Sequence, residues 1–203
     1  MEITKITRQK NDPDRFSVFV DEEFAFGIDS DGLIGLGIKK GRVLSQDELE
    51  ELRHQAEYTK ARDAAVRYLS KGLKSERELR FKLAEKGYSA HSIDRVAELL
   101  LKRGYIDDAE FAKSFVSHKQ KINNFGKQRI VRELIAKGIA EEYIAAAFFE
   151  SDNEAELVSA QKSLAKKLKG RDISALDIPD RRRIIEYMIR RGFSPDMIRE
   201  LIK

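Results

Sequence analysis

The sequence predicts a mainly α fold of three tandem three-helix repeats, preceded by a small N-terminal antiparallel β meander. The repeats are predicted by a spaced pattern that occurs three times. In each copy an apolar residue is followed, after a gap, by a basic residue, a glycine and an apolar residue in a row, and then, after a second gap, by an isoleucine. The glycines of this pattern lie 51 and then 54 residues apart, and an internal period of that size is typical of stacked copies of one helical unit. The meander is predicted by short runs of β-branched and aromatic residues within the first 43 positions.

The three copies of the pattern also share their surrounding register. An apolar residue lies eight positions before each glycine, as Leu79, Ile130 and Ile184. This agreement is stronger evidence than Lys-Gly alone, which ends many unrelated helices. The members of the three copies are Leu83, Lys86, Gly87, Tyr88 and Ile93; Leu134, Lys137, Gly138, Ile139 and Ile144; and Met188, Arg191, Gly192, Phe193 and Ile198.

The N-terminal segment contains three candidate strands, at Ile3–Arg8, Arg15–Val20 and Phe24–Ile28. Turn-forming residues at 11–14 and 21–23 separate them. The glycines that follow, at 32, 35, 37 and 41, predict a permissive connector. A phosphate-binding loop is disfavoured there, because residues 39–42 read Lys-Lys-Gly-Arg and lack the hydroxyl that this motif requires.

The remaining sequence predicts helices with recognisable starts. Ser45, Ser75 and Asp107 each precede a glutamate by three residues, as in a capping box. In the third repeat, Asp180 takes the position of Ser75 directly after Pro179, and Ser194-Pro195 is a further cap. The predicted helices are 46–70, 76–86 and 90–103; 108–121, 127–137 and 141–149; and 154–168, 181–191 and 195–202.

The predicted helix ends follow one rule. A left-handed glycine allows the next residue to pack on the third-from-last helical residue. This pairing is expected at the three repeat glycines and at Gly72 and Gly104. Most aromatic side chains fall at helical core spacings, so packing is their expected role rather than base stacking. They are Phe81, Tyr105, Phe111, Phe115, Phe148, Phe149 and Tyr187.

Composition excludes several classes of function. The 203 residues contain no cysteine, which removes disulfides, thiolate nucleophiles and cysteine-based zinc sites. No apolar stretch approaches the length of a membrane span, and the N-terminus does not resemble a secretory signal. His54, His91 and His118 fall on three different predicted helices without metal-ligand spacing. Asp107-Asp108 is better explained by helix capping than by acid–base or magnesium chemistry. We therefore expect no catalytic residues, metal or cofactor.

Charge is unevenly distributed along the chain. Residues 1–56 carry 8 basic and 12 acidic side chains, whereas residues 57–203 carry 31 and 23. A basic helical body indicates a polyanionic partner, such as nucleic acid or an assembly built upon it. The excess is modest for so many charges, so it does not by itself predict tight binding to free DNA.

Basic residues are the candidate contact residues. One column is basic in all three repeats, although a cation in the last turn of a helix also stabilises the helix dipole. Clusters open the second helices of the second and third repeats, and three arginines in a first turn would oppose the dipole. Arginine suits phosphate or carboxylate, while a solvated face is the alternative for these clusters. The candidates are Arg181, Arg182, Arg183, Lys127, Arg129, Arg132, Lys86, Lys137 and Arg191.

Several of these motifs together resemble a known family. Gly104-Tyr105-Ile106-Asp107-Asp108 followed by Phe111-Ala112 is the most specific stretch, and Gly126 to Ile139 is the next. With the repeat pattern, they closely resemble the RecX family of bacterial recombination regulators over residues 57–203. The first 43 residues look like an extension present in some members, and no function is carried onto them. The third repeat departs most from the pattern, because a longer connector, 169–180, follows its first helix.

The resemblance implies a non-enzymatic, cytoplasmic modulator of the recombinase RecA, acting in homologous recombination, DNA repair and the SOS response. It implies three tandem three-helix units in a curved, elongated shape that bind in the groove of the RecA–DNA filament. Such proteins typically depress the ATPase and strand-exchange activities of RecA. DNA would be contacted weakly or through the filament, and the chain is expected to be a monomer that does not bind membranes.

Other interpretations stay open at this point. Three-helix units also resemble helix-turn-helix folds, so a direct DNA-binding transcriptional regulator is the main alternative. Gln128 and Arg132 are the two residues that would read bases in this alternative. An enzyme is a remote third option. The predicted domains are an N-terminal β extension at 1–43 and helical repeats at 44–106, 107–152 and 153–203.

Overall fold

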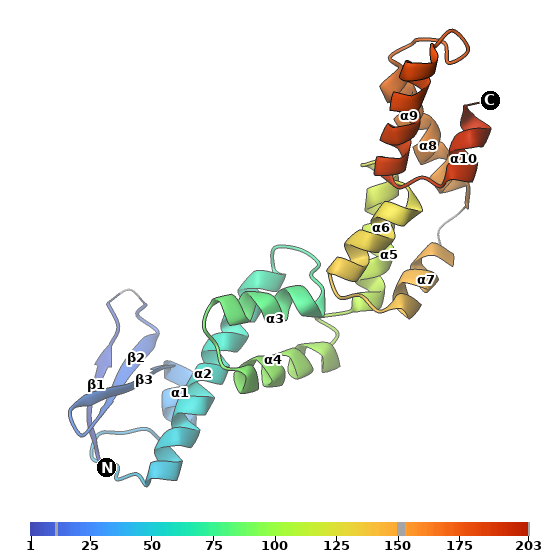
Figure 1. Cartoon of the computed structure of the whole chain (residues 1–203). Helices are drawn as coiled ribbons and strands as arrows, with labels where there is room; N and C mark the ends of the chain where they lie inside the picture. The colour runs from blue at the N-terminus through green and yellow to red at the C-terminus, as the bar shows by residue number, and fades with distance from the viewer. Residues whose placement is uncertain (11, 150–152, 203) are drawn as a thin grey trace. The chain divides into compact units, whose positions relative to one another are not determined.

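The structure is a computed structural model that describes residues 1–10, 12–149 and 153–202. Within these residues the chain forms three strands and ten helices (Figure 1). By its internal contacts the chain divides into two compact units. Unit 1 comprises Met1–Gly72 and Glu78–Tyr105, and unit 2 comprises Leu73–Arg77 and Ile106–Lys203. The predicted mainly α fold with an N-terminal β meander is confirmed.

The three strands form one antiparallel sheet in the order β1-β2-β3. Their bounds are β1 Ile3–Arg8, β2 Arg15–Val20 and β3 Glu23–Asp29. Alternation of side chains places Val18, Val20, Phe26 and Ile28 on one face, where they are buried. The predicted connector departs from expectation, because a short helix, α1 Ser30–Gly35, begins it with Asp29 as its cap.

Helix α2, Gln46–Leu69, covers the buried face of the sheet. Its Leu49, Leu52 and Ala56 belong to the same apolar cluster as Ile3 and Val18. The predicted capping box at its start is confirmed, because the Ser45 hydroxyl accepts from the Glu48 amide and the Glu48 carboxylate accepts from the Ser45 amide. One helix thus packs on the sheet and continues into the first repeat.

The helices after α1 agree with the nine predicted from sequence to within a few residues. Their bounds are α2 as above, α3 Glu76–Glu85 and α4 Ala90–Lys102; α5 Asp108–Lys121, α6 Lys127–Ala136 and α7 Glu141–Phe149; and α8 Asn153–Leu168, α9 Ile178–Arg191 and α10 Pro195–Leu201.

The repeated glycines end the second helix of each repeat in the same way. Gly87, Gly138 and Gly192 have φ of 80°, 82° and 92°. The amide of the residue after each glycine donates to the carbonyl five positions earlier, at 3.4, 3.1 and 3.2 Å. The apolar positions four and eight residues before each glycine are almost fully buried, which confirms the repeat register. They are Leu79, Leu83, Ile130, Leu134, Ile184 and Met188.

Helix α9 starts earlier than the sequence analysis predicted. Its cap is Asp177, whose carboxylate accepts from the Asp180 amide at 2.8 Å, and Pro179 lies inside the first turn. Proline is tolerated there because first-turn amides have no partner within the helix. Consequently Arg181, the first of the three arginines, is the fourth residue of the helix. The three arginines therefore lie farther from the positive end of the helix dipole than predicted, and they oppose the dipole less.

Three of the aromatic residues expected to pack are exposed. Phe81, Tyr105 and Phe149 expose 65%, 66% and 92% of their surface, whereas Phe111 is buried and Phe115 is partly buried in the second repeat. A helical spacing identifies which side of a helix an aromatic occupies, but not whether another element covers that side.

The second helices of neighbouring repeats meet end to end within unit 2. The amides of Gly126 and Gln128, at the start of α6, donate to the carbonyls of Arg191 and Gly192, at the end of α9, at 2.9 and 3.0 Å. These amides have no partner within α6, and Gly126 supplies no side-chain cap. A similar contact precedes it in the chain, where the Ser75 hydroxyl donates to the Lys137 carbonyl at 2.9 Å.

A carboxylate joins α2 to the start of α4 in unit 1. Glu57 accepts from the amide and hydroxyl of Ser89 and from the hydroxyl of Ser92. Partial burial raises the pKa of Glu57, but these hydrogen bonds outweigh it, so the pKa lies below its ordinary value of 4.5. The charged form of Glu57 therefore holds the two helices together.

Replacement of Gly126 tests the end-to-end contact. An alanine β-carbon there would lie 2.4 Å from the carbonyl carbon of Gly192, although the backbone of Gly126 (φ −81°) accepts any residue. We expect Gly126→Ala to lower the free energy of unfolding by about 1–3 kcal/mol, as overpacking does. Urea denaturation followed by circular dichroism measures it. The control is Gly35→Ala, which has open space around it; equal effects would contradict the contact.

Acid titration tests Glu57. Because its pKa is lowered on folding, its stabilisation is fully present above about pH 4.5 and is lost as the pH falls through the folded value. We expect Glu57→Gln to destabilise the chain at pH 7, and the difference from the native chain to shrink below pH 4.5. Thermal unfolding between pH 3 and 7 measures this. The control is Glu51→Gln, an exposed carboxylate on α2; a pH-independent difference for Glu57→Gln would contradict the assignment.

Candidate functional site

The nine predicted contact residues lie in both units. Lys127, Arg129 and Arg132 are on α6, and the arginines at 181–183 are on α9. Lys137 and Arg191 are at the ends of these two helices, whereas Lys86 follows α3 in unit 1. The structure therefore does not bring all nine together in one described site, and their chemical surroundings differ.

A groove lies beside the start of α6. Lys127 and Arg132 are exposed and line it, and its volume is about 610 Å³. The Lys127 ammonium lies 5.1 Å from the centre of the Phe148 ring, and the Lys127 amide donates to the Glu156 carboxylate at 2.9 Å. Gln128, Val131 and Ser194 complete the lining. These two cations remain accessible to an anionic partner.

Arg129 and Arg191 are built into the contact between α6 and α9. Both guanidinium groups lie over the Phe125 ring, at 3.7 and 4.5 Å from its centre. Arg191 also donates to the carbonyls of Asn123 and Asn124, and burial lowers its pKa. Arg129 donates to the Glu133 carboxylate at 3.0 Å. Their first role is thus to hold neighbouring repeats together, and their contact with a partner stays a prediction.

The three arginines of α9 differ in exposure. Arg181 is half-buried and donates to the Ile173 carbonyl at 3.2 Å. The side chains of Arg182 and Arg183 are 81% and 73% exposed, and among the described residues they pair within their own helix, with Glu186 and Asp180. Ion pairs this exposed contribute little to stability, so a partner's anion can replace the carboxylate at small cost.

Lys137 and Lys86 occupy equivalent repeat positions in different surroundings. The Lys137 ammonium lies 5.7 Å from the centres of the Phe111 and Phe115 rings, which are in the core of the second repeat. Lys86 is exposed and lines a different groove, in unit 1.

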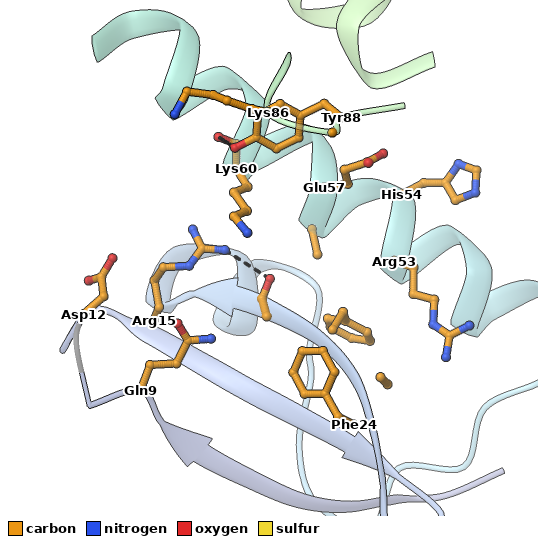
Figure 2. Close-up of a pocket in the computed structure, with 15 residues that line it drawn as sticks. Gln9, Asp12, Arg15, Phe24, Arg53, His54, Glu57, Lys60, Lys86 and Tyr88 are labelled. Carbon is orange, nitrogen blue, oxygen red and sulfur yellow. Dashed lines mark hydrogen bonds between the residues drawn. The ribbon is translucent and has the colours of Figure 1, made fainter. Parts of the chain in front are cut away.

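This second groove has a volume of about 630 Å³ and lies between the sheet, α2 and the turn after α3 (Figure 2). Arg15 comes from β2, Arg53 and Lys60 come from α2, and Lys86 comes from the turn. The first three are not among the contact residues predicted from the sequence. The seven-residue spacing of Arg53 and Lys60 places them on one helix face, a signal that was available. Arg15 could be found only once the sheet was seen to pack on α2.

Among the described residues, no group of three or more potential metal ligands lies together. The structure does bring His54 of α2 and His91 of α4 together, with 5.8 Å between ring centres, which the sequence did not reveal. No helix among the described residues is long and apolar enough to cross a membrane.

Family models match most of the chain. The N-terminal domain of the regulatory protein RecX matches residues 1–45, the first RecX three-helix domain matches 61–100, and the second matches 107–147. The match therefore includes the N-terminal segment to which the sequence analysis assigned no function. The predicted domain boundaries stay predictions, and the one at 152 lies outside the described residues.

Curated relatives match almost the whole of this chain. A regulatory protein RecX of Clostridium acetobutylicum is 33% identical over 99% of this chain and 94% of its own length. The corresponding proteins of Listeria monocytogenes and Bacillus licheniformis are 32% and 34% identical over 97% of this chain, and 73% and 74% of their own lengths.

Solved structures show the same fold. A crystal structure of regulatory protein RecX aligns with a TM-score of 0.73 at 24% identity, covering 99% of this chain and 98% of that one. RecX from Lactobacillus salivarius aligns over 72% of this chain and 94% of its own, with a TM-score of 0.63 at 25% identity. With three matching domains and relatives above 30% identity that cover nearly all of this chain, the chain belongs to the RecX family of regulatory proteins.

Proposed function

We propose that this chain binds the filament that the recombinase RecA forms on DNA, and depresses its ATPase and strand-exchange activities. Membership of a family of regulatory proteins supports a regulatory role. The observation that carries the proposal is the set of exposed cations in unit 2, at Lys127, Arg132, Arg182 and Arg183. A nucleoprotein filament offers both phosphates and acidic side chains to such cations.

The proposed mechanism is binding without chemical turnover, in the cytoplasm. The four cations contact DNA phosphates or carboxylates on the filament. Arg129, Lys137 and Arg191 stay in the proposed contact set, and they also keep α6 and α9 in position through the aromatic contacts described above. A protein that works in this way needs a stable surface rather than a catalytic cleft.

The two most exposed arginines provide the test. We expect R182A/R183A to raise the concentration needed for half-inhibition of the RecA ATPase by about tenfold, which corresponds to about 1.4 kcal/mol of binding. Arg181 is retained because it also bonds the backbone at Ile173. Cosedimentation with RecA on single-stranded DNA, alongside the ATPase assay, measures the effect.

The matched control is K162A/K166A, which removes two exposed cations from α8 in the same repeat. Circular dichroism should show the same helicity in all three proteins. Undiminished inhibition by R182A/R183A would remove the two arginines from the site. A native chain that neither sediments with the filament nor alters its ATPase would refute the proposed function.

A second candidate is direct binding to duplex DNA as a regulator. The observation in its favour is that Gln128 and Arg132 are exposed side by side with Lys127 along the groove at the start of α6. Gln and Arg are side chains that read base edges. A salt titration on naked duplex distinguishes the candidates, because a direct regulator should hold one specific sequence at physiological salt.

A further inference from the structure

The groove of unit 1 contains Gly87. Among the described residues, Gly87 is the one repeat glycine whose turn is not covered by another segment. In unit 2, a β-carbon placed at Gly138 would lie 2.6 Å from the Arg77 side chain, and one at Gly192 would lie 2.4 Å from Arg129. At Gly87 there is no atom within 4 Å of that position. The turn that receives the start of another helix in the second and third repeats therefore faces open space in the first, and Gly87 lines the groove.

Cations surround this opening without carboxylate partners. Arg53, Lys60 and Lys86 form no ion pair with any described residue, and Arg15 makes one hydrogen bond, to the Gly27 carbonyl at 3.2 Å. Figure 2 shows Arg15 reaching up from the sheet and Lys60 reaching down from α2 into the same space. Like charges directed into one opening repel each other unless an anion lies between them.

The acidic groups of the groove do not neutralise these cations. Glu57 is occupied by the amide and hydroxyl of Ser89 and the hydroxyl of Ser92. Asp12, the other carboxylate of the lining, is exposed in the turn between β1 and β2, where it accepts from the Asp14 amide. Four cations against two carboxylates leave the groove positive.

An exposed aromatic ring lies among the cations. Phe24, at the start of β3, is 59% exposed and lines the groove. The Phe19 and Phe24 rings pack edge to face, with 5.9 Å between their centres. Tyr88 forms the opposite wall, where its hydroxyl donates to the Lys60 carbonyl at 3.2 Å and burial raises its pKa. An exposed ring interleaved with cations is the arrangement on which nucleic-acid bases stack while phosphates are neutralised.

We propose that this groove binds a segment of single-stranded nucleic acid, with phosphates held by Arg15, Arg53, Lys60 and Lys86 and a base stacked on Phe24. An acidic peptide would pair with the same cations, but its carboxylates would not stack on the exposed Phe24 ring. These residues all belong to unit 1, whereas the cations on which the proposed function depends belong to unit 2, so the two proposals can fail independently.

Fluorescence anisotropy of a labelled oligothymidine tests the proposal with the full chain. R53A/K60A removes two exposed side chains that make no contact on which the fold depends, and we expect about tenfold weaker binding at low salt. If both contact phosphates, the slope of log K against log salt falls in magnitude by about 1.4, because each phosphate on a single strand contributes about 0.7. F24A should weaken binding about fivefold or more, with a small change in slope.

The matched control is K39A/K40A, which removes two exposed lysines of unit 1 that do not line the groove. The native chain and all variants should give the same helical circular dichroism. Equal affinities of R53A/K60A and K39A/K40A would overturn the proposal, as would a native chain that does not bind the oligonucleotide. Binding lost only in R182A/R183A would place the strand on unit 2 instead. Groove-dependent binding of polyglutamate without binding of the oligonucleotide would assign the groove to an acidic peptide.

Discussion

The second helices of successive repeats meet end to end, and the rest of unit 2 depends on this contact. The unpaired amides that begin α6 donate to the unpaired carbonyls that end α9, so each helix end satisfies the other. The positive end of one helix dipole also meets the negative end of another. This approach is possible only because Gly126 and Gly192 have no side chains and Gly192 adopts a left-handed backbone. Two glycines thus allow this joint, which lies alongside the hydrogen bonds that Ser159 and Ser163 of α8 donate to the carbonyls of Gln120 and Asn124.

This geometry divides the basic residues into two groups. Arg191 lies at the joint itself and covers Phe125, and Arg129 covers the same ring from α6. Their positions are set by packing and by backbone carbonyls, so removing them would disturb the joint as well as any partner contact. Arg182 and Arg183 are exposed on α9 and pair with Glu186 and Asp180 of the same helix. Exposed pairs of this kind exchange partners readily, which suits a surface that binds a large polyanion.

The first repeat differs from the others because the N-terminal sheet, rather than another repeat, lies near its glycine turn. The sheet packs on α2 through Val18 and Phe26 but leaves Gly87 uncovered. The result is a groove whose walls come from elements far apart in sequence. Residues 1–56 are acidic in sum, yet Arg15 and Arg53 from this segment meet Lys60 and Lys86 from the basic part of the chain. The distribution of charge in space, rather than its sum along the sequence, therefore determines what a surface binds.

The sequence by itself determined the fold class, the strands, most helix bounds and the three glycine turns, because periodicity, caps and left-handed glycines are local physical signals. It misplaced the start of α9, since a proline can open a helix as well as precede one. Only the tertiary structure decided which cations are free and which are bound, as the contrast of Lys86 with Arg191 shows. It alone brought Arg15 to Lys60 and left Phe24 and Tyr105 exposed. Burial and ion pairing depend on which elements pack together, and local patterns do not contain that information.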